Sequence, residues 1–401
     1  MTAAASIPCH VCGSQLRTTL YRQEFSGLSS GTFLSGYDVC ICGDCGLAFA
    51  DDLPSGEAFD RYYAEMSRWE HPDNGGRESV EDAGRFEDTA KFLAQGPLDR
   101  SGPVLDIGCS TGGLLAAMRR EGFGQLHGLD PSPQCAKLAR QNYGLDLFTG
   151  PVGILPELPS NFGLVCLSGV LEHFYDPNEV LQDIRARLVG DGYLYVSVPD
   201  ATRFAEYMDA PFQQFSLEHI MYFTPTSLTN LLARNGFQPI KTRLTAHPYT
   251  RRYRYPSVEG IFRVAQASEW TRDGSGERGL RAYINASSAW EHQIERQIDS
   301  LVAEQQPVLV WGVGTNTQRL MATTALRQVN IVAFVDTNPH YHGKMLDGRP
   351  VLAPEAITQY SEPIVIASII YRDEITAQIQ QLGAANRLIN LGGEFAGGDS
   401  A

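Results

Sequence analysis

The stretch Val104-Leu-Asp-Ile-Gly-Cys-Ser-Thr-Gly-Gly-Leu-Leu115 decides the fold of this chain. Its first four residues are mostly apolar, as in a short buried strand, and Gly108, Gly112 and Gly113 precede a helical pattern. Glycine lets the backbone approach a ligand closely, and a helix N-terminus adds a partial positive charge. A strand, a glycine turn and a helix in this order therefore predict a site for a nucleoside or a phosphate group.

The glycine turn has the spacing Asp106-x-Gly108-x-Ser110-x-Gly112, which differs from the dinucleotide pattern G-x-G-x-x-G. It resembles the first motif of class I S-adenosylmethionine (SAM) methyltransferases, D/E-x-G-x-G-x-G, with Ser110 at the middle glycine position. This resemblance implies that the cofactor is SAM and that these four residues bind it.

A second predicted strand, residues 126–130, ends in Asp130, 24 residues after Asp106. An acid at this place can accept hydrogen bonds from both ribose hydroxyls of a nucleoside. Pro131 and Ser132 then begin the next helix, and Ser132 is suited to cap it. Alone, Asp130 would be interpreted as a helix cap. Together with the glycine turn, it favours a SAM site that includes Pro131 and Ser132.

Two Cys-x-x-Cys pairs, each followed by glycine, lie near the N-terminus: Cys9-His-Val-Cys12-Gly13 and Cys42-Gly-Asp-Cys45-Gly46. In a reducing compartment, such clustering indicates a metal site rather than disulfides. Four thiolates suit tetrahedral zinc and leave no open position, so we expect a structural zinc ion bound by these four cysteines. Cys40 and His10 are spare donors, and reduced thiols in a loop are the alternative.

The composition limits the classes of partner. The net charge of −14 argues against broad attraction to nucleic acid or to an anionic membrane, so we expect a small-molecule substrate. No apolar run reaches the roughly 18 residues that span a bilayer. The N-terminus lacks the basic and apolar segments of a secretory signal, so a cytoplasmic location is expected.

Strand and helix patterns alternate through residues 101–245, which predicts a doubly wound α/β fold. A second strand and glycine turn, Val308 to Gly314, predicts a smaller Rossmann-like unit that binds a cofactor, contacts the substrate or serves as scaffold. The length of 401 residues suits two or three domains. We therefore expect a zinc-binding domain (1–75), a SAM-dependent methyltransferase domain (76–245), a linker with a long helix (246–305) and a C-terminal Rossmann-like domain (306–401).

Polar residues follow the fourth predicted strand, 162–167, at the edge of the sheet where ligands bind. Ser168, Glu172 and His173 are therefore expected close to the methyl donor, with Ser168 among the cofactor-binding residues. An insertion over residues 201–223 contains the pair Glu218-His219.

The order of these features resembles that of the zinc-containing sugar C-methyltransferases of deoxysugar biosynthesis, which act on nucleotide-linked 4-keto sugars. The resemblance covers nearly the full chain, and its specific motifs include Glu218-His219-x-x-Tyr222-Phe223 and Trp311-Gly-Val-Gly-Thr. It implies that His219 is the general base, that Glu218 and a histidine at position 173 lie in the active site, and that Tyr63 or Tyr62 is an active-site tyrosine.

The chain departs from this family at one position. The family commonly has a tyrosine two residues before the glutamate of the Glu-His pair, where this chain has Ser216. The pattern Phe-Ser-x-Glu-His is closer to a related branch of methyltransferases in polysaccharide gene clusters.

We therefore predict C-methylation of a nucleotide-linked keto sugar. His219 would remove the α-proton of the ketone, and His173 would polarise the carbonyl oxygen. An O- or N-methyltransferase on a sugar or another small metabolite is one alternative, and a non-catalytic SAM-binding or assembly protein is another. The tyrosines and arginines of residues 249–255 either hold a diphosphate or form a solvated loop.

Overall fold

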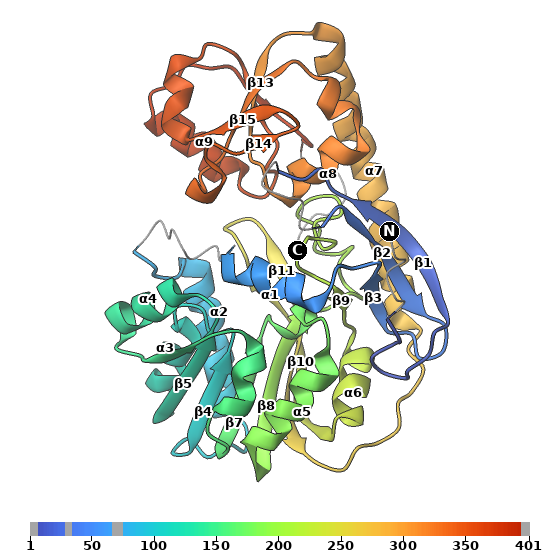
Figure 1. Ribbon diagram of the computed structural model, residues 1–401, viewed down its shortest axis with the longest axis vertical. Coiled ribbons are helices and arrows are strands. Elements are labelled where there is room, and N and C mark those ends of the chain that lie inside the picture. The colour runs from blue at the N-terminus through green and yellow to red at the C-terminus, as the bar shows by residue number, and fades with distance from the viewer. Residues whose placement is uncertain (1–6, 29–33, 66–74, 394–401) are drawn as a thin grey trace.

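The computed structural model describes residues 7–28, 34–65 and 75–393. Their strands form a four-stranded, a seven-stranded and a six-stranded sheet, which lie at the side, the bottom and the top of the molecule in Figure 1. The α/β fold class expected from the sequence is confirmed.

The seven-stranded sheet has the order β10-β11-β8-β7-β4-β5-β6. Its strands are β4 (Pro103–Ile107), β5 (Gln125–Asp130), β6 (Leu147–Thr149), β7 (Phe162–Ser168), β8 (Leu188–Pro199), β10 (Phe237–Pro248) and β11 (Arg254–Val264). β4 to β8 are parallel, and β11 runs antiparallel between β8 and β10. Because helices cover both faces of a parallel sheet, β4 and β7 are buried over most of their length.

The helices of this sheet begin where the sequence supplies a cap. They are α2 (Val80–Ala94), α3 (Gly113–Arg120), α4 (Pro133–Tyr143), α5 (Pro177–Arg187) and α6 (Pro225–Arg234), with the 3-10 turns η1 (Val152–Glu157) and η2 (Leu171–His173). Side chains before four of them accept backbone N–H groups: Ser79, Ser132, Asp176 and Thr224. Each cap satisfies a donor that the first turn of a helix leaves unpaired.

Strand β11 corrects the expected boundary at residue 245, because it lies in the segment assigned to the linker. Its central residue, Glu259, is fully buried and interrupts the apolar pattern of a core strand. The guanidinium of Arg243 lies 2.8 Å from the Glu259 carboxylate, and His247 contacts its other oxygen. Both partners come from β10, so the hairpin neutralises a charge that the sequence pattern leaves unexplained.

The four-stranded sheet joins distant parts of the chain. It contains β1 (Arg17–Glu24), β2 (Gly36–Cys42), β3 (Ala48–Asp51) and β9 (Met221–Tyr222), and the helix α1 (Gly56–Glu65) follows β3. β9 belongs to the insertion that follows β8, and it pairs with β3 through Ala48 opposite Tyr222 and Phe49 opposite Met221. The backbone N–H of Ala50 donates to the carbonyl of Ile220 at 2.8 Å. The N-terminal sheet therefore continues directly into the segment that follows His219.

The six-stranded sheet has the order β14-β15-β13-β12-β16-β17. Its elements are β12 (Val308–Trp311), α8 (Thr315–Thr323), η3 (Ala325–Gln328), β13 (Ile331–Val335), η4 (Pro339–Tyr341), β14 (Met345–Leu346), β15 (Arg349–Leu352), η5 (Pro354–Gln359), β16 (Ile364–Ile366), α9 (Arg372–Gln381) and β17 (Leu388–Asn390). Asp336 follows β13, and its carboxylate accepts from the backbone N–H groups of Val313 and Asn338, both at 2.8 Å. These bonds tie the glycine turn after β12 to the end of β13.

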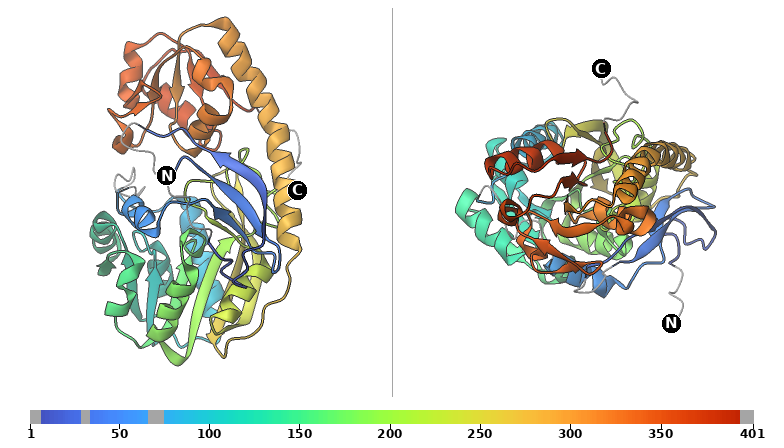
Figure 2. Two further views of the ribbon diagram at one scale, coloured as in Figure 1. Left: turned by 45° about the vertical axis from the view of Figure 1, so that its right-hand side comes forward. Right: turned by 90° about the horizontal axis from the view of Figure 1, so that it is seen from above.

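Helix α7 (Ser275–Glu304) is 30 residues long and runs along one side of the molecule, from the lower sheet to the upper one (Figure 2). Near its lower end, a Cβ atom on Gly279 would lie 2.6 Å from the carbonyl oxygen of Ala201. Farther along, the indole N–H of Trp290 donates to the carbonyl of Gly392 at 2.7 Å. The helix is thus packed against both the unit of the seven-stranded sheet and the unit of the six-stranded sheet. No helix in the described ranges is long and apolar enough to cross a membrane.

Candidate active site

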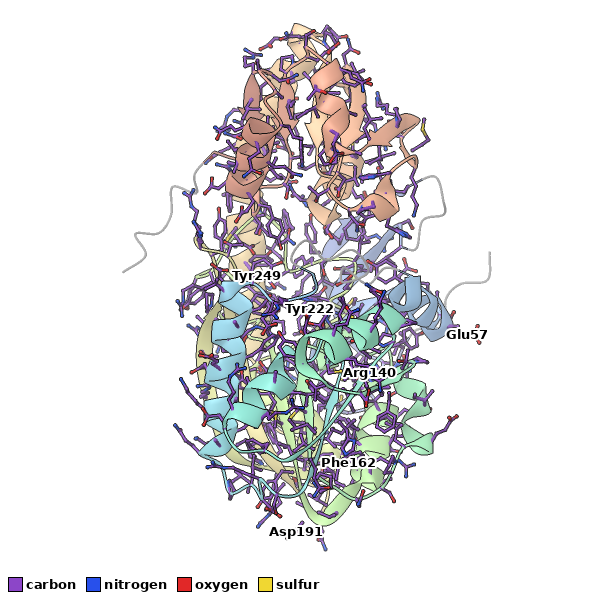
Figure 3. The ribbon with its side chains drawn as sticks, turned by 90° about the vertical axis from the view of Figure 1, so that its left-hand side faces the viewer. Glu57, Arg140, Phe162, Asp191, Tyr222 and Tyr249 are labelled. Atoms are coloured by element: carbon purple, nitrogen blue, oxygen red, sulfur yellow. The ribbon has the colours of Figure 1, made fainter. Side chains whose placement is uncertain are left out.

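The expected site residues gather where the seven-stranded sheet faces the C-terminal unit. Figure 3 shows Tyr222 and Tyr249 at this junction, whereas Phe162 and Asp191 lie toward the far end of the lower unit. Phe162 begins β7 and Ser168 ends it, so the junction holds the carboxyl ends of the parallel strands. Ligands of open α/β sheets bind at this edge.

The turn after β4 requires glycine for both conformation and space. Gly108 and Gly112 have φ angles of 69° and 85°, in the left-handed region. A Cβ atom on Gly108 would lie 2.6 Å from a methyl group of Val170, and one on Gly112 would lie 2.9 Å from Leu145. Ser110 also has a positive φ, 50°, without being glycine, and its buried hydroxyl has no hydrogen-bond partner within the described part of the chain.

Asp130 links the two loops of the expected SAM site. One oxygen of its carboxylate accepts from the backbone N–H of Ser110 at 2.8 Å, and the other accepts from the backbone N–H of Ser132 at 3.0 Å. Burial raises the pKa of Asp130, and these two backbone bonds oppose that shift. Each carboxylate oxygen has a second lone pair, so the residue can still accept ribose hydroxyls. Pro131 lies between Asp130 and Ser132 in the sequence.

Asp106 is an almost fully buried acid at the centre of the edge, with 2% of its surface exposed. Burial, with a smaller contribution from Asp130, raises the pKa of Asp106 to about 8, and Arg85 opposes this. A cationic ligand would offset the cost of ionising such a group. SAM carries an ammonium group and a sulfonium group, so the acids fit SAM in charge. Ser168, at the end of β7, lies opposite Ser197 of β8 on the same edge.

The two candidate histidines meet although they are 46 positions apart in the sequence. The rings of His173 and His219 have centroids 5.0 Å apart and are nearly perpendicular. Nδ1 of His173 lies 3.0 Å from the backbone carbonyl of Glu218, and Nε2 of His173 lies 4.0 Å from Oε1 of Glu172. The structure therefore brings η2 and the Glu218-His219 pair into one cluster.

Ser216 orients this pair. Its hydroxyl oxygen accepts from the backbone N–H groups of Glu218 at 3.2 Å and His219 at 3.1 Å. The hydroxyl of Tyr37, in β2, donates to the carbonyl of Ser216 at 2.8 Å, and the Tyr222 hydroxyl lies 3.0 Å from the carbonyl of His219. The serine at the position where the resembled family has tyrosine thus has a structural task in this chain.

The side chains of the pair have different surroundings. Burial lowers the pKa of His219 to about 3, with a further contribution from His173, so its ring is neutral near pH 7. The hydroxyl of Tyr62 donates to Oε1 of Glu218 at 3.1 Å. Tyr63 lies in the helix α1, but its side chain is outside the described residues. Of the two tyrosines weighed from the sequence, Tyr62 is therefore the one with a described contact to Glu218.

Glu172 was placed near the donor by the sequence but was not assigned a role. It is 2% exposed, and its Oε2 atom has no hydrogen-bond partner within the described ranges. Its position next to His173 was the available signal. The sequence does not show that Glu172 and His173 contact the segment around His219. That contact depends on how the insertion over residues 201–223 folds back.

The four cysteines of the two pairs also form one cluster. Sγ of Cys9 lies 3.3 Å from Sγ of Cys45, Sγ of Cys12 lies 3.5 Å from Sγ of Cys42, and all four sulfurs lie within 4.8 Å of one another. Zinc–sulfur bonds of about 2.3 Å in a tetrahedron place sulfurs about 3.8 Å apart, so the donor set fits zinc. Cys40 is outside the cluster and faces Thr19.

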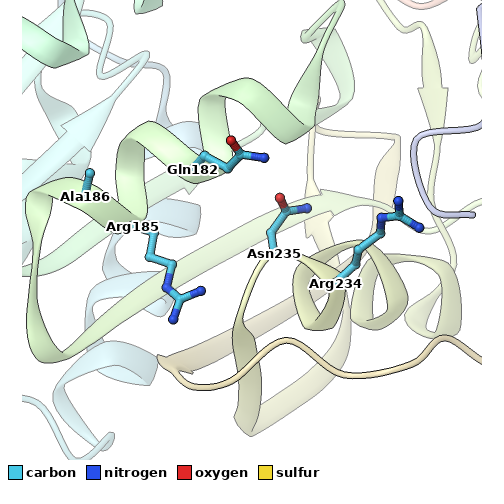
Figure 4. Close-up of a pocket in the computed structure, with 5 residues that line it drawn as sticks. All are labelled: Gln182, Arg185, Ala186, Arg234 and Asn235. Atoms are coloured by element: carbon cyan, nitrogen blue, oxygen red, sulfur yellow. The ribbon is translucent and has the colours of Figure 1, made fainter. Parts of the chain in front are cut away.

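One surface cavity, of about 540 Å³, lies away from this edge (Figure 4). It is lined by Gln182, Arg185, Ala186, Arg234 and Asn235. Its two guanidinium groups donate to backbone carbonyls, Arg185 to Ala265 at 2.9 Å and Arg234 to Val11 at 2.5 Å. Arg185 precedes β8 and Asn235 precedes β10, so this cavity lies at the amino ends of the strands and is no part of the candidate site.

Replacement of Ser110 by glycine should stabilise the protein by about 1 kcal/mol, because it removes a left-handed non-glycine residue and an unpaired buried hydroxyl. SAM affinity should stay within about twofold of wild type, since the backbone N–H that binds Asp130 is retained. Denaturant unfolding and SAM titration measure the two quantities. Ser110→Ala is the matched control, because it removes the hydroxyl and keeps the φ cost. A large loss of SAM affinity in both variants would instead indicate that the hydroxyl contacts SAM.

Asp106 should make the SAM-free protein less stable as the pH rises. Its folded pKa, about 8, lies above the ordinary value near 4, so between these values the folded state holds a proton that the unfolded state has lost. The free energy of unfolding should therefore fall from pH 5 to pH 8, and Asp106→Asn should flatten this slope while weakening SAM binding. Urea unfolding across this pH range tests the expectation. Parallel profiles for wild type and variant would contradict it.

Comparisons with known proteins also indicate a methyltransferase domain. Residues 81–242 match the family model of a methyltransferase domain, and residues 304–389 match that of the C2185-like N-terminal domain. The C-methyltransferase NovU of Streptomyces niveus is 25% identical over 272 residues, which cover 63% of this chain and 62% of that protein. The tRNA U34 carboxymethyltransferase of Ectopseudomonas mendocina is 31% identical over 156 residues, which cover 36% of this chain and 48% of that protein.

Among solved structures, the SAH-bound magnesium protoporphyrin IX methyltransferase from Synechocystis PCC 6803 is 17% identical, with a TM-score of 0.39, and the match covers 52% of this chain and 99% of that chain. This chain spans less than two thirds of the length of either curated relative named above. Residues 81–242 form a SAM-dependent methyltransferase domain of the class I fold.

Proposed function

We propose that this chain transfers the methyl group of SAM to a carbon atom of a nucleotide-linked keto sugar. The observation that carries the proposal is the packing of the glycine turn against the segment that leads to the histidine cluster. Val170, which would touch a Cβ atom on Gly108, lies two residues before Glu172. A methyl donor on the turn would therefore adjoin Glu172, His173 and the Glu218-His219 pair. The relative named C-methyltransferase supports transfer to carbon.

Methylation of carbon begins with the loss of a proton next to a ketone. The C–H bond breaks, the proton passes to a base of the protein, and the electron pair remains on the substrate as an enolate. SAM, when bound, supplies the electrophilic methyl group, and its C–S bond breaks with the electron pair left on sulfur as the new C–C bond forms. The protein's part is to hold the ketone, take the proton and later release that proton to water.

The neighbouring residues Glu218 and His219 are the candidates for the base. The resemblance implies His219, but a ring with a pKa near 3 is a weak proton acceptor at neutral pH. The Glu218 carboxylate is already oriented by the Tyr62 hydroxyl. We assign proton removal to this pair, and the exchange experiment below separates its two side chains.

The expected role of His173 as a donor to the carbonyl oxygen depends on which ring nitrogens carry a proton. A backbone carbonyl can only accept, so Nδ1 of His173 donates to Glu218. Nε2 is the other ring nitrogen, and it lies 4.0 Å from Oε1 of Glu172. A proton on Nε2 would be needed for His173 to donate to the enolate oxygen.

A second cavity, of about 350 Å³, supports a nucleotide diphosphate as part of the substrate. It lies between the loop that joins β10 to β11 and the start of α9, and it is lined by Thr250, Arg251, Arg252, Tyr253, Ile369, Ile370, Arg372, Asp373, Glu374 and Ala377. A guanidinium group can donate two parallel hydrogen bonds to the oxygens of one phosphate. Next to it, the hydroxyls of Tyr249 and Tyr371 lie 2.9 Å apart and bridge the two units.

Proton exchange tests the proposed reaction directly. In D2O without SAM, the enzyme should exchange the α-proton of a nucleotide-linked 4-keto sugar for deuterium, and with SAM the sugar should gain one methylene. Glu218→Gln and His219→Gln should both keep SAM affinity, and a variant that keeps exchange excludes its residue as the base. NMR follows exchange and locates the new carbon. A methylene gained on oxygen or nitrogen without exchange would support the alternative, O- or N-methylation.

We also propose a structural zinc ion on Cys9, Cys12, Cys42 and Cys45. Each cysteine turn is fixed to a later segment of the chain. The side-chain amide of Asn178, in α5, donates to the His10 carbonyl at 3.0 Å, and the backbone N–H of Asp273, in the loop before α7, donates to the Cys45 carbonyl at 2.8 Å. Cys42 ends β2, which continues through a turn into β3 and so to β9. Zinc would thus secure the sheet that holds the Glu218-His219 pair.

Cys12→Ser should release zinc and lower the melting temperature by at least about 5 °C, because the ion contributes directly to folding free energy. SAM affinity should change little, since the glycine turn belongs to another sheet, whereas α-proton exchange should fall. Metal analysis, thermal melting and SAM titration measure these effects. Cys40→Ser is the control and should keep both zinc and melting temperature. An unchanged melting temperature in zinc-free Cys12→Ser protein would contradict a structural role.

A further inference from the structure

Three side chains of the candidate site have a composition typical of metal ligands. Glu172, His173 and His219 each offer one oxygen or nitrogen atom, and these atoms all lie within 4.8 Å of one another. Two of the residues come from η2, immediately after β7, and His219 comes from the turn before β9. The backbone N–H of Ile220 donates to the Glu172 carbonyl at 3.0 Å and fixes the two segments together.

The hydrogen bond of Nδ1 orients the His173 ring, so that Nε2 faces this cluster. Nδ1 donates to the backbone carbonyl of Glu218, so Nε2 is the nitrogen that a metal would bind, and it lies 4.0 Å from Glu172 Oε1. Histidine ligands of metals usually donate their second ring N–H to a backbone carbonyl or a carboxylate, which fixes the tautomer and the ring orientation. His173 already has this arrangement.

Glu172 supplies a second and independent observation. Its side chain is 2% exposed, and Oε2 has no hydrogen-bond partner among the described residues. A buried carboxylate is costly unless it is paired with a cation or bound to a metal. The charge at Glu259, by comparison, is met by Arg243 and His247.

We propose that Glu172, His173 and His219 bind a divalent cation, which holds an oxygen of the substrate at the reacting centre. Two imidazoles and one carboxylate suit ions such as Mn²⁺, Fe²⁺ or Zn²⁺ and leave coordination positions open. Metal–ligand bonds of roughly 2.1 Å separate ligand atoms by roughly 3.0 to 3.5 Å. The three side chains would therefore move slightly closer together to bind the ion. This inference rests on the proposed function and extends it.

The cation would perform the task expected of His173 from the sequence. As a Lewis acid, it stabilises the oxygen on which negative charge develops when the α-proton leaves. With His219 as a ligand, proton removal passes to its neighbour Glu218, whose side chain is oriented by Tyr62. The site differs in chemistry from the cysteine cluster, because nitrogen and oxygen ligands accept Mn²⁺ and thiolates prefer zinc.

Titration of the full-length, zinc-containing protein with Mn²⁺ tests the proposal, with free Mn²⁺ measured by electron paramagnetic resonance. Wild type should bind one Mn²⁺ per chain, and Glu172→Gln should weaken binding by at least about tenfold. The matched control is His247→Gln, which changes a buried histidine beside a buried glutamate elsewhere in the fold and should bind Mn²⁺ as wild type does. SAM titration of each variant verifies that the methyltransferase domain is folded.

Absence of Mn²⁺ binding by wild type up to about 1 mM would overturn the proposal, as would equal binding by wild type and Glu172→Gln. Methyl transfer measured on the same samples separates this failure from failure of the proposed function. If methyl transfer to a keto sugar proceeds in protein that binds no Mn²⁺, the cation site is wrong and the function stands. If Mn²⁺ binds as expected but no keto sugar gains a methylene, the cation site stands and the proposed function is wrong.

Discussion

The backbone pairing of β3 with β9 is the contact on which the candidate site depends. β9 has only two residues and follows the Glu218-His219 turn, so the turn inherits its position from the N-terminal sheet. Within the loop, Ser216 accepts both backbone N–H groups of the pair. On the other side, the backbone N–H of Ile220 donates to the backbone carbonyl of Glu172. The site is therefore assembled at the line where the N-terminal sheet meets the methyltransferase sheet, and each of these units supplies part of it.

The parts that could be predicted from the sequence are those whose physical cause is local. The turn from Asp106 to Gly112 needs positive φ angles and small residues within seven positions, and this need appears directly as glycines. Asp130 lies at the end of the neighbouring strand, at a distance fixed by one helical connection. The four cysteines lie in two short turns with characteristic spacing, and they come together in the structure. The α/β class follows from the same short-range patterns.

The parts that could not be predicted depend on partners far along the chain. Glu259 made β11 look unlike a core strand, because its neutralising partners come from β10. The hydrogen bond from His173 to Glu218 crosses 45 residues, and it decides which ring nitrogen faces Glu172. No sequence pattern carries that information. The donor role expected for His173 rests on residue type alone and stays a prediction.

The continuous helix α7 has a geometric consequence for the whole molecule. At 1.5 Å per residue, its 30 residues form a rod of about 45 Å, anchored below at Gly279 and above at Trp290. Its residue count therefore sets both the separation and the angular phase of the two units. One inserted residue between the anchors would advance the upper unit by about 1.5 Å and rotate it by about 100°. Insertion of roughly seven residues would preserve the phase but would still move the upper unit by about 10 Å, so only the present length meets both anchors.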